Sequence, residues 1–393
     1  MNSFYNTHTY LLKHLKAPAR RYLMDEINWN DRLIGIKGTR GVGKTTFLLQ
    51  YAKENFKADD RTCLYVNTNN FYIQTKGLPA FAEEFQEQGG RVLLIDQVFK
   101  LSDWSKQLRD CHENFPNLKI VFTGSSVMRL KEENPELNGI AQSYNLRGFS
   151  FREYLNLITG ENFPAYTLDE IISGHEEIAK EITSRTQPRK YFKAYLEQGF
   201  YPFCQDSSNF QENLLKTMNM IIEVDILLLK QIELKYLPKI KELFYLLTTG
   251  GTGMPNVSKL SATLGMSRAT VMNYIKYLAD ARLINILYHK GDAFPKKPAR
   301  IVLHNSNLMH SFYPMDFDNH DYFEAFFCNT LWKDHTVNKS SKAGVYVVDG
   351  DKDFKIVEHG TRQKSKSTCL FAVNDTDIGH KNQIPLYMLG FLY

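Results

Sequence analysis

The chain has 393 residues, of which 43% are hydrophobic and 23% are charged, and its formal net charge at pH 7 is +5. This composition is ordinary for a globular protein, and the length predicts about two to four domains. The small positive charge permits contact with nucleic acid but does not require it.

The five cysteines lie far apart and show no disulfide or metal-binding spacing, which favours a reducing compartment. The N-terminal segment lacks the apolar core of a signal peptide. The most apolar later stretch, MIIEVDILLL, contains Glu223 and Asp225 and is too short to span a bilayer. We therefore expect a soluble, cytoplasmic protein that does not enter a membrane.

The first strong motif is a phosphate-binding loop between a predicted strand at 33–37 and a predicted helix at 45–51. The sequence GTRGVGKT fits the pattern G-x-x-x-x-G-K-[ST], and a glycine-rich turn with a chance lysine is the disfavoured alternative. Lys44 is expected to reach the β- and γ-phosphates of ATP, and the Thr45 hydroxyl to coordinate Mg²⁺. The predicted nucleotide-binding residues are Gly38, Thr39, Arg40, Gly41, Val42, Gly43, Lys44, Thr45 and Thr46.

The other half of the site is predicted at the ends of later strands. The apolar run at 92–95 reads as a buried strand that ends at Asp96, which would share the Mg²⁺ with Thr45. A strand at 118–122 ends at Thr123, whose hydroxyl could sense the γ-phosphate or the attacking water. Further strands are predicted at 62–68 and 143–148, with helices between them. This alternation predicts an α/β fold with a parallel, doubly wound sheet, which binds ligands at the carboxyl ends of its strands.

These motifs carry a resemblance to a known family. The segments GTRGVGKTT, LLIDQVFKLSDW, IVFTGSS and LRGFSFREYL together resemble AAA-type ATPases of the archaeal-ATPase group, which are related to the STAND signalling ATPases. The resemblance extends to GFYPF at 199–203 and more weakly to the end of the chain. It implies an ATPase core at 1–155, a helical lid or linker at 156–240, a winged helix at 241–303 and a degenerate nuclease-like α/β domain at 304–393.

Gln97 departs from the family pattern, in which this position is usually the glutamate that polarises the attacking water. An amide can hydrogen-bond to that water but cannot accept its proton. The predicted catalytic residues are Lys44, Asp96, Gln97 and Thr123. Two readings stay open: a naturally slow ATPase, or a deliberate Glu-to-Gln change that traps ATP, which the otherwise intact site favours.

Arginines are further candidates for stabilising transition-state charge, although each is more often a surface or ion-pair residue. The candidates are Arg40, Arg129, Arg147 and Arg152. Trp104 matches the tryptophan of the family, and we expect it to pack in the core.

The second half of the chain begins with helical apolar spacing at 151–158, 168–185 and 213–232. A helix at 257–264, a turn at Gly265 and a second helix capped by Ser267 then predict a helix-turn-helix. Its predicted DNA-contacting residues are Arg268, Asn273, Lys276 and Tyr277, and those of a basic wing tip are Lys290, Lys296, Lys297 and Arg300. A packing or protein-interaction role for this region is the alternative.

The C-terminal region is predicted to contain a helix and several strands. In the nuclease-like domains that it resembles, an acid and an E-x-K motif bind metal. Here Val345 occupies the expected acid position, and no lysine follows Glu358 at the required spacing, although Asp349 remains. We therefore expect a degenerate fold that does not cleave nucleic acid.

Taken together, the sequence predicts an ATP-binding AAA-type ATPase with Mg²⁺ as its cofactor. Its nucleotide state would control domain arrangement or assembly, and hydrolysis would be slow. The alternative is a DNA-binding regulator in which ATP gates the winged helix. A homo-oligomer is expected by analogy with the AAA class, and DNA stays open as a partner.

Overall fold

The computed structural model describes residues 1–393 except 129–133, 206, 250–254, 313–316, 359 and 361–367. The chain forms two compact units, Met1–Gly148 and Phe149–Tyr393.

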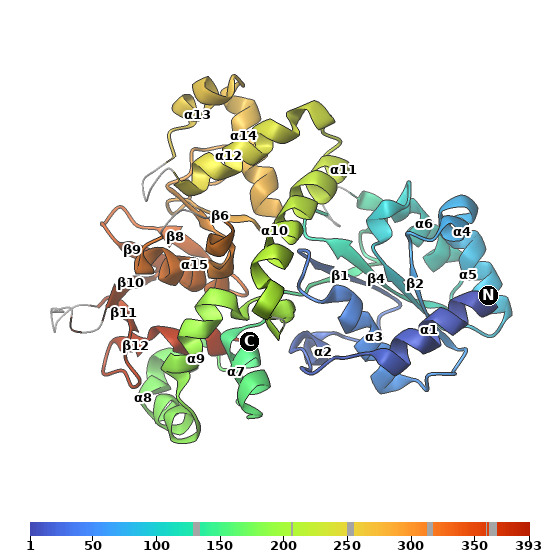
Figure 1. Cartoon of the computed structure of the whole chain (residues 1–393), viewed down its shortest axis with the longest axis horizontal. Helices are drawn as coiled ribbons and strands as arrows, with labels where there is room; N and C mark the ends of the chain where they lie inside the picture. Colours follow the sequence, from blue (N-terminus) through green and yellow to red (C-terminus); the bar gives the residue numbers. More distant parts are fainter. Residues whose placement is uncertain (129–133, 206, 250–254, 313–316, 359, 361–367) are drawn as a thin grey trace. The chain divides into compact units, whose positions relative to one another are not determined.

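A five-stranded parallel sheet organises the N-terminal unit (Figure 1), with the strand order β2-β3-β4-β1-β5. All four strand pairs are parallel, which confirms the predicted fold class. The order places β1 and β3 on either side of β4. The strands are β1 (Leu33–Gly38), β2 (Cys63–Asn67), β3 (Val92–Asp96), β4 (Lys119–Ser125) and β5 (Gln142–Asn145).

Helices cover both faces of this sheet, as expected for parallel strands with buried apolar runs. On one face, residues of α1 to α3 form a core cluster with strand residues such as Ile36, Tyr65 and Leu94. On the other face, the Trp104 ring of α6 lies 6.5 Å from the Phe122 ring, in keeping with a packing role for Trp104. The helices are α1 (Asn2–His14), α2 (Leu23–Glu26), α3 (Lys44–Asn55), α4 (Phe71–Lys76), α5 (Leu78–Glu87) and α6 (Trp104–Asn114).

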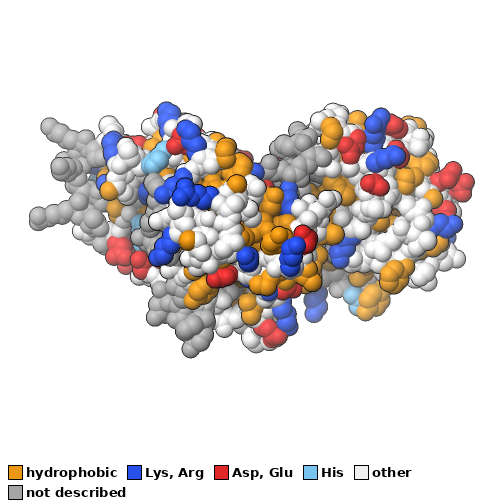
Figure 2. All heavy atoms as spheres, turned by 90° about the horizontal axis from the view of Figure 1, so that it is seen from above, with side chains coloured by type: hydrophobic (Ala, Val, Ile, Leu, Met, Phe, Trp, Pro, Cys, Tyr) orange, Lys and Arg blue, Asp and Glu red, His pale blue; other side chains and the backbone are white. Residues whose placement is uncertain are grey.

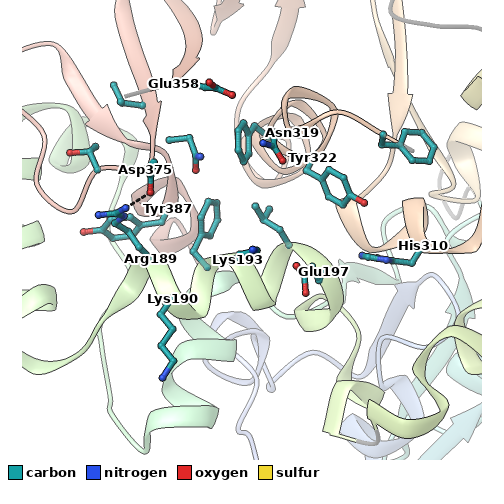
Figure 3. A pocket seen from close by; sticks show the side chains of 17 residues that line it. Arg189, Lys190, Lys193, Glu197, His310, Asn319, Tyr322, Glu358, Asp375 and Tyr387 are labelled. Carbon is teal, nitrogen blue, oxygen red and sulfur yellow. Dashed lines mark hydrogen bonds and ion pairs between the residues drawn. The ribbon is translucent and has the colours of Figure 1, made fainter. Parts of the chain in front are cut away.

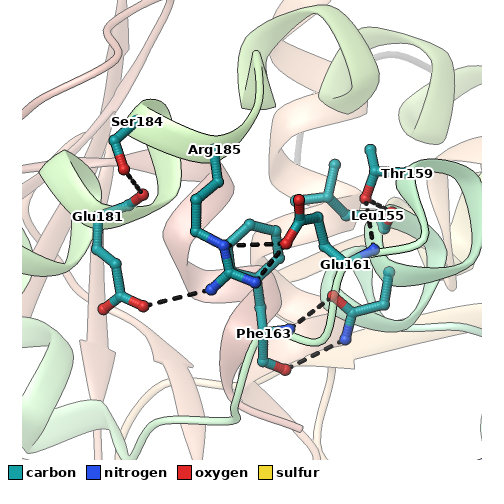
Figure 4. Close-up of polar contacts among 8 residues, drawn as sticks. Leu155, Thr159, Glu161, Phe163, Glu181, Ser184 and Arg185 are labelled. Atoms are coloured by element: carbon teal, nitrogen blue, oxygen red, sulfur yellow. Dashed lines mark hydrogen bonds and ion pairs between the residues drawn. The ribbon is translucent and has the colours of Figure 1, made fainter.

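The first helices of the second unit begin at capping residues that can be recognised in the sequence. Ser150 and Thr167 each form a capping box with the glutamate three residues later, which satisfies free backbone N–H groups at the first turn. The connection between α7 and α8 is held by Arg185, whose Nε donates to Glu161 at 2.9 Å (Figure 4). The helices are α7 (Phe151–Thr159), α8 (Leu168–Arg185), α9 (Pro188–Ala194), α10 (Phe210–Met220), α11 (Leu227–Leu229) and α12 (Leu237–Thr249).

A helix pair and a strand pair follow α12. The first helix ends at Gly265, which has φ 59°, a left-handed conformation that glycine adopts without steric cost. Ser267 caps the second helix by accepting from the backbone N–H of Thr270 at 3.1 Å. The elements are α13 (Val257–Leu264), α14 (Arg268–Asp280) and the antiparallel strands β6 (Ile284–Leu287) and β7 (Arg300–Leu303). Their assignment as a winged helix stays a prediction.

A second five-stranded sheet, of order β12-β11-β10-β9-β8, completes the unit together with α15 (Asn319–Leu331). Strands β8 to β10 are antiparallel, whereas β10 to β12 are parallel. Asp349 and Gly350 form the tight turn between β9 and β10, both with positive φ. The strands are β8 (Val337–Lys339), β9 (Val345–Val348), β10 (Lys352–Glu358), β11 (Leu370–Asn374) and β12 (Gln383–Pro385). The division of the chain into four functional segments stays a prediction.

The structure corrects the prediction for Arg300. This residue does not belong to an exposed basic tip, because it begins β7 and is only 6% exposed. Its Nε donates to both carboxylate oxygens of Glu324 at 3.1 Å, and Tyr346 donates its hydroxyl to the same carboxylate. Charge read along the sequence suggested a surface role, whereas α15 supplies a buried acid that only the tertiary structure brings close.

We predict that Glu324→Ala strongly destabilises the second unit, because it leaves the guanidinium of Arg300 buried without its main partner. The expected loss in the free energy of unfolding is about 3–5 kcal/mol. Asp292→Ala is the matched control, since it breaks an ion pair with Lys296, whose side chain is 65% exposed, and should cost about 0–1 kcal/mol. Urea denaturation followed by tryptophan fluorescence measures both losses, and equal losses would contradict this assignment.

Candidate nucleotide-binding site

The phosphate-binding loop lies between β1 and α3, as the motif predicts. Gly41 and Gly43 have φ values of 82° and 91°, which residues with side chains rarely adopt. Lys44 donates from Nζ to the carbonyl oxygens of Gly38 and Thr39, both at 2.8 Å. The ammonium group is therefore held across the loop in which phosphate oxygens would be bound.

Asp96 is the buried centre of the site. It ends β3 with only 1% of its surface exposed. Its Oδ2 accepts a hydrogen bond from Thr45 Oγ1 at 2.7 Å, and its Oδ1 accepts one from Thr123 Oγ1 at 2.5 Å. The structure thus brings together three predicted site residues that are 51 and 27 positions apart in sequence.

Gln97 follows Asp96 in a left-handed conformation with φ 61° and ψ 44°. Its backbone N–H donates to Thr123 Oγ1 at 2.9 Å, and its carbonyl oxygen accepts from Thr68 Oγ1 at 2.7 Å. These two bonds hold the backbone in a conformation that costs a residue with a side chain about 1–2 kcal/mol. Residue 97 is therefore fixed beside the carboxylate and is partly exposed.

Sequence reasoning missed two contributors from β2. Tyr65 donates its hydroxyl to Asp96 Oδ2 at 3.0 Å, and Asn67 donates from Nδ2 to the same oxygen at 3.3 Å. Burial, together with the charge of Asp96, raises the pKa of Tyr65 well above its ordinary value, so the phenol stays a donor. The sequence predicted the strand, but only the sheet order shows that Asn67 is in register with Asp96.

The back of β2 is fixed by the N-terminal helix. The backbone N–H of Tyr65 donates to His8 Nδ1 of α1 at 3.0 Å. Burial lowers the pKa of His8 to about 4, so at neutral pH the imidazole is uncharged and can accept this bond. β2 is an edge strand of the sheet, and His8 thus accepts one of its edge N–H groups.

The candidate arginines have different positions. Arg152 belongs to the second unit, where it donates to the carbonyl oxygens of Tyr393 at 3.0 Å and Phe163 at 3.1 Å. Arg129 lies outside the described residues. Catalytic roles for Arg40 and Arg147 stay predictions.

The residues around Asp96 fit a magnesium ion chemically. Mg²⁺ prefers oxygen ligands and is usually held by one or two carboxylates together with substrate phosphates. The Thr45 hydroxyl and the Asp96 carboxylate are such ligands, and they already lie 2.7 Å apart. Within the described part of the chain, no group of three or more His, Cys, Asp or Glu side chains forms an all-protein metal site.

A separate cavity of about 900 Å³ lies in the second unit, lined by α9, α15 and the ends of β10 and β11 (Figure 3). Its charged side chains include Lys193 and Glu358, of opposite sign. Arg189 is engaged on the cavity wall with Asp375 and, at 3.2 Å, with Asp377. This mixture of charges favours no single class of ligand.

Some of the lysines predicted to contact DNA already interact with other groups of the protein. Lys296 pairs with Asp292 at 2.6 Å, and Lys290 donates to the carbonyl oxygen of Gly350 at 2.9 Å. Arg268 and Asn273 are exposed on α14. On the face drawn in Figure 2, Lys and Arg side chains are interspersed with acidic and hydrophobic ones. DNA binding stays a prediction.

Residues 30–155 match the family model described as an AAA domain. With its parallel five-stranded sheet, the N-terminal unit resembles the fold of an AAA-type P-loop ATPase. This fold suggests nucleotide binding and an ATPase type of function, usually with Mg²⁺. Residues 189–300 of the second unit match a family model described as a domain of unknown function.

The chain is also similar to individual proteins. An uncharacterized protein of Methanocaldococcus jannaschii is 26% identical over 290 residues, which are 70% of this chain and 60% of that protein. The chain thus spans about 60% of that relative's length.

Two solved structures share low similarity with the chain. RuvB of Thermotoga maritima is 14% identical, with a TM-score of 0.33 over 80% of this chain and 96% of RuvB. The Orc1 protein of Aeropyrum pernix, solved in complex with DNA, is 11% identical, with a TM-score of 0.34 over 82% of this chain and 91% of that protein. The fold assignment therefore depends on the strand order and the family match.

In the described residues, no helix is long and apolar enough to cross a membrane.

We predict that Tyr65→Phe destabilises the AAA-type unit by about 1.5–3 kcal/mol, because it removes a hydrogen bond to a charged, buried acceptor. Tyr5→Phe is the matched control. It removes a bond of 3.0 Å to the neutral carbonyl oxygen of Arg61 and should cost about 0.5–1.5 kcal/mol. Chemical denaturation of both variants gives the comparison, and a smaller loss for Tyr65→Phe would refute the role assigned to its hydroxyl.

Proposed function

We propose that this protein is an ATP-binding AAA-type ATPase in which nucleotide state controls domain arrangement or assembly, with hydrolysis weakened by Gln97. One observation carries the proposal. The buried Asp96 carboxylate accepts from Thr45 of the phosphate-loop helix and from Thr123 of β4, beside a complete phosphate loop.

The proposed binding step uses the loop between β1 and α3. Backbone N–H groups around Gly41 and Gly43, together with the positive end of the α3 dipole, would hold the phosphates of ATP. Lys44 would exchange its carbonyl partners for phosphate oxygens. Thr45 and Asp96 would hold Mg²⁺, which neutralises phosphate charge when bound.

The proposed weakness lies in proton transfer from the attacking water. The backbone of Gln97 is held next to Asp96 by Thr68 and Thr123. Its side-chain amide could orient that water but could not accept its proton. Thr123 would sense the γ-phosphate, since its hydroxyl is already bonded to both Asp96 and the backbone of residue 97. ATP would therefore bind normally but would be hydrolysed slowly.

The proposed output is a change in domain arrangement or in self-assembly. Support comes from the division of the chain into two compact units, with the first ending at Gly148. A homo-oligomer is proposed by analogy with the AAA class.

We predict that Lys44→Ala removes measurable ATP·Mg²⁺ binding, because it deletes the cation that would pair with the β- and γ-phosphates. Lys53→Ala, at an exposed position of the same helix, should bind like the parent protein. Isothermal titration calorimetry measures both affinities. Unchanged affinity of Lys44→Ala would contradict the assignment of the phosphate loop.

We predict that Gln97→Glu raises the rate of ATP hydrolysis by about 10²–10⁴-fold, the usual contribution of a general base. Gln88→Glu adds the same charge at an exposed position after α5 and should leave the rate unchanged. Phosphate release at saturating ATP gives the rates. Equal turnover by the parent and Gln97→Glu would refute the general-base assignment.

A further inference from the structure

A buried arginine in the segment between α1 and α2 joins two distant parts of the AAA-type unit. Arg21 is 5% exposed. Its Nη1 donates to the carbonyl oxygen of Val42 at 2.9 Å, and its Nη2 donates to those of Arg147 at 2.7 Å and Gly148 at 3.1 Å. One guanidinium thus links the phosphate loop to the last two residues of the first unit.

The position of the Val42 carbonyl group, which Arg21 contacts, depends on the conformation of the phosphate loop. Val42 lies between Gly41 and Gly43, both of which have left-handed backbone angles. The N–H groups of this stretch are those expected to turn toward phosphate oxygens. A rotation of these peptide groups on nucleotide binding would therefore also move the Val42 carbonyl group.

The segment before the unit boundary contacts the base of the same loop. The backbone N–H of Leu146 donates to the carbonyl oxygen of Lys37 at 2.8 Å. A Cβ atom on Gly38 would lie only 2.4 Å from the carbonyl oxygen of Leu146, so the two backbones are in close contact. Residues 146–148 are thus attached to the loop directly at its start and through Arg21 at its middle.

We infer that Arg21 is a positioning residue that couples nucleotide binding in the loop to residues 147 and 148, where the chain leaves the first unit. This inference rests on the proposed function, because it requires a nucleotide at the loop. The planar guanidinium donates in fixed directions, so a shift of Val42 changes the geometry available to Arg147 and Gly148. A lysine at position 21 would retain charge but could not reproduce this fork of donors.

The test measures the distance between the two units in the full-length chain. Spin labels are placed at the exposed positions of Gln88→Cys and Lys259→Cys, in a Cys204→Ser background because Cys204 is the one cysteine that is not buried. Electron–electron resonance distances are recorded with and without ATP·Mg²⁺. The variants are Arg21→Lys and Arg21→Met. Arg20→Met is the matched control, since Arg20 is an exposed neighbour paired with Asp25.

We expect ATP·Mg²⁺ to shift the distance distribution in the parent and in Arg20→Met, and to leave it unchanged in both Arg21 variants. The Arg21 variants should still bind ATP within about threefold of the parent affinity, as measured by calorimetry. An unchanged shift in Arg21→Lys, or a parent that binds ATP without any shift, overturns the inference. Absence of ATP binding by the parent instead refutes the proposed function.

A second measurement avoids substitutions and so does not depend on the variants folding. Hydrogen exchange of the backbone amides at 147–149 is followed in the parent protein with and without ATP·Mg²⁺. We expect nucleotide to change exchange at these amides as well as in the phosphate loop. A change confined to the loop overturns the inference.

Discussion

The geometry of the candidate site depends on the placement of one buried carboxylate. Asp96 receives hydroxyl donors from Thr45, Tyr65 and Thr123, and an amide donor from Asn67. A buried charge is costly unless it is paired or hydrogen-bonded, so these donors both stabilise the carboxylate and fix its direction. The helix after the phosphate loop, the edge strand β2 and the central strand β4 are thereby all oriented toward the same group.

The hydrogen bonds around Asp96 continue to the backbone of the next residue, Gln97. Thr123 bonds to the backbone N–H of Gln97, and Thr68 bonds to its carbonyl oxygen. The identity of residue 97 therefore changes chemistry without changing the backbone that presents it. A glutamine at this position is therefore compatible with the placement of the proposed nucleotide-binding groups.

The second unit uses buried polar groups for a different purpose. Arg300 and Glu324 join β7 to α15, and Tyr346 of β9 donates to the same glutamate. This network ties the strand pair to the C-terminal sheet, because breaking it would leave a charge buried. Because Arg300 is buried in this network, it adds no positive charge to the surface near the helix pair. Electrostatic attraction of this region to DNA phosphates is correspondingly smaller.

By itself, the sequence determined the phosphate loop, the acid at the end of β3, the Thr123 hydroxyl near the end of β4 and the parallel sheet that carries them. These features depend on short-range patterns: glycine spacing, apolar runs and the residue that follows each run. The tertiary structure alone decided that Tyr65 and Asn67 face Asp96, that Arg300 is buried against Glu324, and that Arg21 reaches both Val42 and Gly148. Such contacts depend on strand order and on which helix covers which group, and residues far apart in sequence leave no local pattern that records them.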